Sequence, residues 1–404
     1  MSLGYRRRGV FPQFRDFIPN EDALAVSRLK QAGAIIIGKT NIPVGLRDFQ
    51  SYNGIYGTTN NPWDLSRSPG GSSGGSAAAL AAGFGPLSLG SDIGGSIRVP
   101  AHFCGVFGHK PSLGLIPLRG YSLPPAPPVP GQGDLAVVGP LTRYASDLTL
   151  SLDVIAGPDD AREGIGYRLA LPSPRHADLR NFRVLVIDTH PLVPTGNAVR
   201  TAIAGLAQRL ARLGTKVAHS SASLPSLADS ARLYMQLLDA ARSPRLTCEA
   251  FIEAQRRAAA LSAGDHGLQA ERRRGMVMSH RDWLATDAAR LQLQQQWRVL
   301  FSEFDVLVYP SAAVPAFLQD RSEPIEARQI DIDTKPYPYL DAFFIWADPA
   351  TTCGLPATAV PVDRSATGLP IGVQIIGPYL EDRTTIAFAE LLEREFGGFV
   401  PPTL

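Results

Sequence analysis

Cysteine is scarce in this sequence of 404 residues, and the few cysteines form no recognisable motif. Cys104, Cys248 and Cys353 are far apart and form no Cys-x-x-Cys pair. A disulfide framework and a cysteine-bound zinc ion are therefore not expected. The seven histidines lack metal-ligand spacing, and the glycine-rich segments lack the Gly-Lys-Ser/Thr ending of a phosphate-binding loop. We predict no metal and no cofactor.

The sequence also lacks an excess of charge of one sign and lacks long apolar runs. The 39 basic and 37 acidic residues leave a net charge of +2, which provides no field for binding nucleic acid or a membrane. No apolar run approaches the roughly 18 residues of a transmembrane helix. The first residues lack the apolar core of a signal peptide. We predict a cytoplasmic protein whose partner is a small molecule.

Two serines stand out because glycines flank both of them. Ser72 lies in the first tract, Ser68 to Ser76 (Ser-Pro-Gly-Gly-Ser-Ser-Gly-Gly-Ser), and Ser96 lies in the second tract, Gly90 to Arg98 (Gly-Ser-Asp-Ile-Gly-Gly-Ser-Ile-Arg). Glycine lets the backbone approach a ligand closely, so that a serine attacks a carbonyl while N–H groups hold the oxyanion. One such tract alone fits a linker equally well. The second tract runs directly into an apolar stretch, which places it inside a folded region.

The rest of the chain alternates helical and strand patterns. Residues 20–32 predict a helix capped by Asn20, and residues 34–37 predict a short buried strand. The alanine-rich residues 74–83 predict a helix that begins inside the first tract. Residues 224–301 are mostly helical. This order is typical of an α/β protein.

Several of these segments together resemble the amidase signature family. The resemblance is carried by Gly33 to Asn41, Gly70 to Ser76, Gly90 to Pro100, Phe103 to Pro111, Gly354 to Pro356 and Gly368 to Gln374. It implies a single α/β/α domain over residues 1–404 with a large mixed sheet, in which residues 224–301 form a helical insertion over the pocket. A homodimer that covers an exposed sheet edge is a further expectation.

The resemblance also assigns roles to residues of both tracts. Ser96 is the nucleophile that forms an acyl-enzyme, and Ser72 is the bridging serine, which follows a cis peptide bond and relays a proton. The backbone N–H groups of Ile93, Gly94, Gly95 and Ser96 form the oxyanion hole. Asp92 and Arg98 orient the site, and Ser73 makes hydrogen bonds within it.

The family's third catalytic residue is a neutral lysine, and by the resemblance it would lie before Met1. The five lysines present are Lys30, Lys39, Lys110, Lys216 and Lys335. Lys39 and Lys110 match family positions that are not the base, and we expect them to brace loops beside the tracts. His102 and His109 flank the second tract and are the alternative bases, but structural hydrogen bonds suit them better. No Gly-x-Ser-x-Gly elbow occurs.

Three functions follow, in order of preference. The first is an amidase that hydrolyses a carboxamide C–N bond. The second is an amidase-like binding or assembly protein that lacks turnover because it lacks the lysine. The third is an amidotransferase-type subunit. The expected pocket walls, residues 121–130 and 337–346, are rich in aromatic residues and proline, which hints at an apolar acyl or aryl group.

Overall fold

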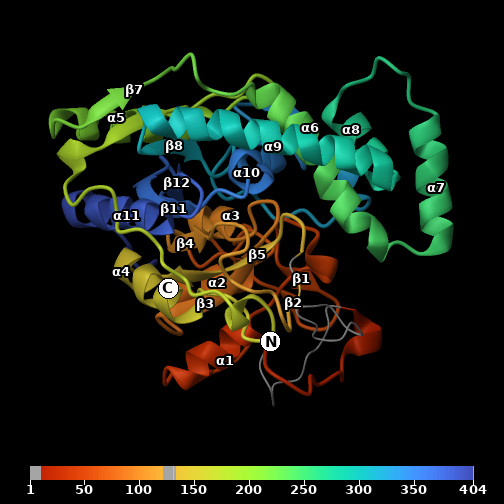
Figure 1. Cartoon of the computed structure of the whole chain (residues 1–404), viewed down its shortest axis with the longest axis horizontal. Coiled ribbons are helices and arrows are strands. Elements are labelled where there is room, and N and C mark those ends of the chain that lie inside the picture. Colours follow the sequence, from red (N-terminus) through yellow and green to blue (C-terminus); the bar gives the residue numbers. More distant parts are fainter. Residues whose placement is uncertain (1–10, 122–130, 132, 404) are drawn as a thin grey trace.

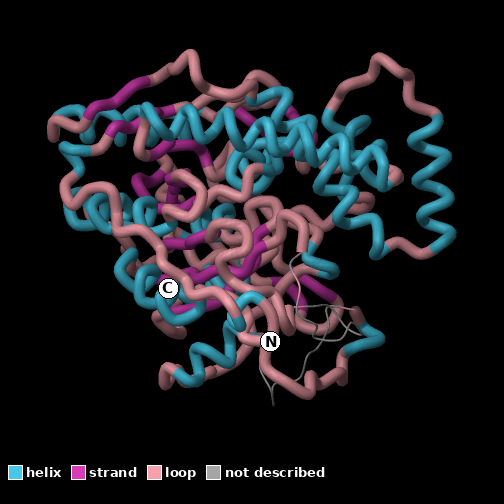
Figure 2. Tube along the Cα trace, viewed as in Figure 1, coloured by secondary structure: helices cyan, strands magenta, loops and turns pink. Residues whose placement is uncertain are grey.

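The computed structural model describes residues 11–121, 131 and 133–403, and eight strands of this part form one mixed sheet (Figure 2). Across the sheet they follow the order β3 (Leu87–Asp92), β5 (Val137–Thr142), β4 (Phe107–Lys110), β11 (Ala357–Arg364), β12 (Pro370–Ile376), β8 (Val306–Pro310), β6 (Arg183–Val186) and β7 (Lys216–Ala218). Neighbours from β3 to β8 are antiparallel, whereas β8, β6 and β7 run parallel. The predicted large mixed sheet is confirmed.

Successive side chains of the central strands enter opposite cores, because side chains alternate across a strand. Val306 and Val308 of β8 join one core, and Leu307 and Tyr309 join the other. The first core is shared with α1 (Leu24–Gln31), α4 (Ala145–Ile155), α5 (Asn197–Arg212) and α11 (Asp382–Phe396). The second core is shared with α6 (Leu227–Arg242), α8 (Leu268–Met276), α9 (His280–Glu303) and α10 (Asp341–Thr352). Helices thus cover both faces of the sheet (Figure 1).

Shorter elements surround the β3 end of the sheet and the entry to α10. The helices α2 (Gly74–Ala81) and α3 (Arg98–Cys104) pack on each other in a third, smaller core. Two hairpins stand outside the main sheet, β1 (Tyr52–Asn53) with β2 (Gly57–Thr58) and β9 (Gln329–Ile332) with β10 (Lys335–Pro338). The predicted helix at residues 74–83 is confirmed in α2.

The predicted helical stretch is present as α6, α7 (Cys248–Ala259), α8 and α9. The helices α6 and α8 pack on each other, whereas α7 has no buried residue and stands apart from the strands at the right of Figure 1. A 3₁₀ turn, Ser243–Arg245, follows the end of α6. In the described residues, no helix has the length and apolar character needed to cross a membrane.

Two predictions near the N-terminus need correction. The helix α1 begins at Leu24, and its N-cap is Ala23, which makes no side-chain capping bond, rather than Asn20. Residues 34–37 form no strand, and Ile35 and Ile37 are 87% and 74% exposed. The described sheet ends at β3 instead. A short apolar run favours an extended backbone, but its side chains are buried on both sides only where the segment pairs with another strand inside a sheet.

Candidate active site

The first tract forms the turn into α2 and is held by neutral hydrogen bonds. Ser51 Oγ donates to the Gly70 carbonyl at 3.0 Å and accepts from the Gly74 N–H at 3.0 Å. The peptide bond between Gly71 and Ser72 is cis, as the resemblance implied. Ser72 is 1% exposed. The sequence thus places this serine in a buried turn directly ahead of a helix.

Glycine is required in the first tract because other backbone segments lie against it. A Cβ atom at Gly71 would lie 2.2 Å from the Asp48 carbonyl oxygen, and one at Gly75 would lie 2.4 Å from the Asn41 carbonyl oxygen. Real Cβ atoms do not approach other atoms so closely. The small residues therefore allow the backbone around Ser72 to pack against two neighbouring loops.

The second tract leaves the end of β3 and turns into α3 around the carboxylate of Asp92. This carboxylate accepts from the backbone N–H groups of Gly95, at 2.8 Å, and Ile97, at 3.0 Å. It also accepts from the guanidinium of Arg98 through Nε, at 3.1 Å, and Nη2, at 2.8 Å. Asp92 is fully buried, which disfavours its charged form, yet the Arg98 guanidinium and these bonds hold the pKa of Asp92 below its ordinary value.

Arg98 connects this turn to elements that lie far away in the sequence. Its guanidinium donates to the side chain of Gln374 in β12 at 2.8 Å and to Thr351 Oγ1 in α10 at 2.9 Å. It also donates to the Ala347 carbonyl at 3.2 Å. Arg98 is 0% exposed. The Asp92–Arg98 pair therefore holds the tract that carries Ser96 in place.

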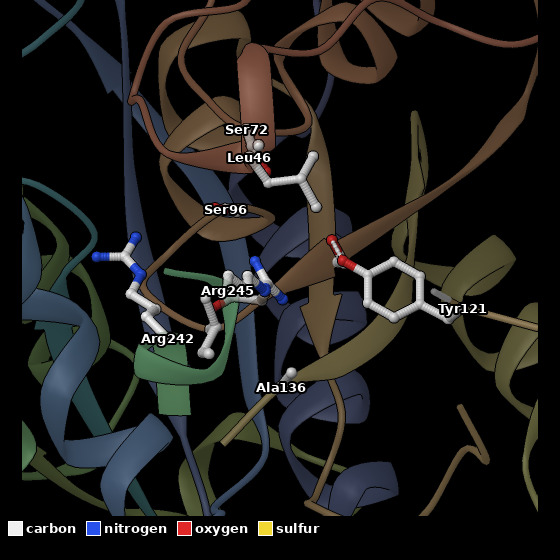
Figure 3. Close-up of a pocket in the computed structure, with 11 residues that line it drawn as sticks. Leu46, Ser72, Ser96, Tyr121, Ala136, Arg242 and Arg245 are labelled. Carbon is white, nitrogen blue, oxygen red and sulfur yellow. Dashed lines mark hydrogen bonds between the residues drawn. The ribbon is translucent and has the colours of Figure 1, made fainter. Parts of the chain in front are cut away.

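A direct contact joins the two tracts. The Ser73 N–H donates to the Ser96 carbonyl at 3.1 Å, and Ser73 Oγ accepts from the Ser91 N–H at 3.3 Å. Ser72 and Ser96 consequently line the same pocket (Figure 3). Its lining consists of Gly45, Leu46, Ser72, Ser91, Asp92, Ile93, Ser96, Tyr121, Ala136, Arg242 and Arg245.

The backbone donors beside Ser96 differ from the expected set in one position. The Gly95 N–H donates to the Asp92 carboxylate, so this N–H group is not available to an oxyanion. Within the described residues, the N–H groups of Ile93, Gly94 and Ser96 have no hydrogen-bond partner. Tyr234 of α6 donates to the Ile93 carbonyl at 2.7 Å and so fixes the peptide orientation at this turn.

The candidate bases lie elsewhere. His102 contacts the Val314 carbonyl at 3.0 Å and accepts from the Gly372 N–H at 2.6 Å, while His109 bridges Thr358 and Asp382. Burial lowers the pKa of His102 to about 4. Their predicted structural role is confirmed. In the described residues, no Lys, His, Asp or Glu side chain is hydrogen-bonded to the hydroxyl of Ser72 or Ser96.

Lys110 is buried at the end of β4. Its ammonium nitrogen donates to the carbonyls of Pro111, at 2.9 Å, and Leu355, at 2.8 Å, and burial lowers its pKa to about 7. The expectation that this lysine braces a loop is confirmed. Lys30 is paired with Asp22, and Lys216 and Lys335 are exposed.

The pocket walls differ from those expected. Tyr121 lines the pocket and donates to Ser91 Oγ at 2.6 Å, but residues 122–130 lie outside the described part. Residues 337–346 do not line it, and Phe344 instead packs behind Gly94. No local sequence pattern marks Leu46, Arg242 and Arg245 as pocket residues, because only the fold brings them beside a serine. Within the described residues, no three His, Cys, Asp or Glu side chains are grouped as metal ligands.

Comparison with known proteins gives consistent matches over the whole length. A family model described as Amidase matches residues 8–386. Fatty-acid amide hydrolase 2-A of Danio rerio is 32% identical over 96% of this chain and 71% of the relative. A glutamyl-tRNA(Gln) amidotransferase subunit of an Exiguobacterium species is 32% identical over 100% of this chain and 84% of the relative. The solved structure of 6-aminohexanoate cyclic dimer hydrolase superposes with a TM-score of 0.75 at 26% identity, over 100% of this chain and 84% of the other.

Proposed function

The chain belongs to the amidase signature family, whose members hydrolyse amide bonds, and we propose that it cleaves the C–N bond of a small carboxamide through an acyl-enzyme on Ser96. The observation that carries the proposal is the meeting of Ser72 and Ser96 in one pocket, beside the unengaged N–H groups of Ile93 and Gly94. A nucleophile next to preorganised donors is the minimum that acyl transfer requires.

The proposed reaction has two steps. Ser96 Oγ attacks the amide carbonyl carbon, and the carbonyl oxygen becomes an oxyanion held by the N–H groups of Ile93, Gly94 and Ser96. The C–N bond then breaks, and the proton from Ser96 passes through the Ser72 hydroxyl to the leaving nitrogen. Water attacks the acyl-enzyme in the second step, which releases the acid and restores Ser96.

Asp92 and Arg98 serve this reaction as positioning residues. Asp92 holds the N–H groups of Gly95 and Ile97, on either side of Ser96, and Arg98 fixes the carboxylate. Ser73 ties the backbone of Ser96 to the first tract. The donors therefore do not have to reorganise when charge develops on the substrate.

A fluorophosphonate probe tests the nucleophile directly. We expect one adduct, on Ser96, found by peptide mass spectrometry of the labelled protein, and loss of labelling in Ser96→Ala. The matched control is Ser76→Ala, because Ser76 belongs to the first tract but its hydroxyl contacts Thr40 at 2.8 Å rather than the pocket. Labelling that persists in Ser96→Ala contradicts the assignment.

A second candidate is an amidase-like protein that binds an amide without efficient turnover. It is favoured by one observation, that no titratable side chain of the described residues is hydrogen-bonded to either hydroxyl. General base catalysis contributes about 10²- to 10⁴-fold in rate, so its loss is measurable. Probe labelling of Ser96 without hydrolysis of an amide panel would support this candidate. Hydrolysis that Ser96→Ala abolishes would exclude it.

The third candidate, an amidotransferase-type subunit, is supported by the similarity to the glutamyl-tRNA(Gln) amidotransferase subunit of the Exiguobacterium species. Affinity purification of the tagged protein from its source cells tests this candidate. A stoichiometric partner whose addition raises release of ammonia from glutamine would favour it over a free-standing amidase.

A further inference from the structure

Two arginines line the pocket that holds Ser72 and Ser96. Arg242 comes from the last turn of α6, and Arg245 comes from the 3₁₀ turn that follows it. In Figure 3 the side chain of Arg245 lies below Ser96, with Arg242 to its left and Tyr121 to its right. Arg242 is partly buried and Arg245 is exposed, so this wall places beside Ser96 a positive charge that an anionic ligand can pair with and a neutral aliphatic amide cannot.

The acidic groups nearby do not neutralise this wall. Asp92 is the one acidic residue of the lining, and its carboxylate is already held by Arg98 and two backbone N–H groups. Asp239 faces Arg242 at 3.4 Å, but it also takes a closer bond, at 2.9 Å, from Arg272. One carboxylate is thus shared by two guanidinium groups.

Arg245 differs from Arg242 in having no such partner. Arg242 is held in place by Asp239 and lies over the ring of Phe344 at 5.4 Å. Arg245 has no ion pair or hydrogen bond among the described residues. Its positive charge lies close enough to Tyr121 to oppose the rise in the pKa of that hydroxyl that burial causes. Arg245 is therefore the cation that is free to bind a ligand.

We propose that the substrate is an amide that also carries a carboxylate, and that Arg245 binds this carboxylate while Ser96 faces the amide carbon. The proposal rests on the amidase function proposed above and names its substrate class. A guanidinium binds a carboxylate through two parallel N–H bonds, which fixes the direction of the substrate as well as its affinity. Arg242 adds to the positive potential at the pocket and favours anionic substrates over neutral ones of the same shape.

Matched amides that differ in one group test the proposal. One pair is a dicarboxylic acid half-amide and its diamide, with the charge on the acyl side. The other is an N-acyl amino acid and its primary amide, with the charge on the amine side. We expect kcat/KM to favour the anionic member of at least one pair by about 10- to 100-fold, the range of a charge-assisted hydrogen bond. The pair that shows it identifies the side that Arg245 binds.

The variant Arg245→Met should abolish this preference, so that kcat/KM of the anionic member falls to that of its neutral counterpart. Arg256→Met is the matched control, because Arg256 lies on α7, is 77% exposed and pairs with Glu253 at 4.0 Å. It should retain the preference. Equal kcat/KM for both members of each pair, or a preference that survives in Arg245→Met, overturns the proposal while leaving the amidase function intact.

Binding to Ser96→Ala separates the two proposals when no turnover is found. Calorimetry with both pairs of ligands should show that the anion of at least one pair binds at least about 10-fold more tightly than its neutral counterpart, and that this difference is lost in Ser96→Ala/Arg245→Met. That result supports the substrate class even if the amidase function fails. Equal binding within both pairs contradicts the substrate class on its own.

Discussion

The two glycine–serine tracts meet at one pocket but are held there by different forces. The first tract is fixed by neutral contacts, from the hydroxyls of Ser51 and Ser68 and from backbone that leaves no room for a Cβ atom. The second is fixed by a buried ion pair, Asp92 with Arg98, and is followed by the buried His102. One tract is therefore specified by shape and the other by charge.

This difference predicts which substitutions destabilise each tract. Shape is insensitive to pH and intolerant of added atoms where the obstacle is backbone. A buried ion pair is intolerant of losing one partner, because the other charge is left without compensation. Substitutions in each tract separate these two cases.

The largest effect is expected from Arg98→Met. The substitution leaves the Asp92 carboxylate buried without its guanidinium, and the contacts to Gln374 and Thr351 are also lost. Breaking a buried pair in this way costs about 3–5 kcal/mol. Denaturant unfolding should show this loss together with loss of probe labelling at Ser96. Arg383→Met removes an exposed pair with Asp153 and should cost no more than about 1 kcal/mol; equal losses in both variants would contradict the role of burial.

The second prediction concerns His102 and pH. Its pKa is about 4 in the fold, because burial disfavours the charged ring, against 6.5 for the unperturbed group. Between these values the unfolded chain binds a proton that the native chain does not, so stability falls as pH drops from 6.5 towards 4. The group accounts for about 3 kcal/mol of that fall. The Gly372 N–H already points at Nδ1, so protonation there also breaks a hydrogen bond.

Denaturant unfolding at pH 6.5 and pH 4 measures this dependence. His102→Gln should lose less stability over the interval than the wild type, by about 3 kcal/mol. The exposed His280 at the start of α9 provides the control, and His280→Gln should keep the wild-type pH dependence. A His102→Gln protein with the wild-type slope would show that the ring does not remain neutral in the fold.

The same contrast explains what the sequence reveals. The first tract can be recognised in the sequence because its crowded backbone requires glycine. The second can be recognised because Asp92 and Arg98 stand six positions apart in a single turn. The core strands can be predicted from their apolar runs. The prediction of a strand at residues 34–37 is wrong because a four-residue apolar run does not specify a partner strand. Arg245 was not predicted because only the fold brings the end of α6 beside Ser96.

A third prediction compares a glycine from each tract. Gly71→Ala should cost about 3 kcal/mol, the upper end for added atoms in a packed interior, because its Cβ would meet the backbone of Asp48 and Gln50. Gly94→Ala should cost about 1 kcal/mol, since its Cβ would lie 2.8 Å from the ring of Phe344, which is a side-chain rather than a backbone obstacle.

A double-mutant cycle tests the reason for that difference. Gly94→Ala with Phe344→Leu should be less destabilised than the sum of the single variants, because the smaller side chain leaves room for the new methyl group. Additive losses in this cycle would show that the backbone, rather than the ring, limits the second tract. For Gly71 no side-chain truncation should restore stability, since its obstacles are backbone atoms.

At the first tract, Ser51→Ala should have a smaller effect than Gly71→Ala, and this effect should not depend on pH. Removal of the hydroxyl leaves the Gly70 carbonyl and the Gly74 N–H buried without this partner, which costs about 2 kcal/mol. Neither group titrates, so the loss should be the same at pH 4 and pH 7 in denaturant unfolding. The exposed Ser173→Ala provides the control and should lie within about 0.5 kcal/mol of the wild type. A loss that grows at low pH would mean that the first tract also depends on charge, because only a titrating neighbour changes the worth of a neutral hydrogen bond between these pH values.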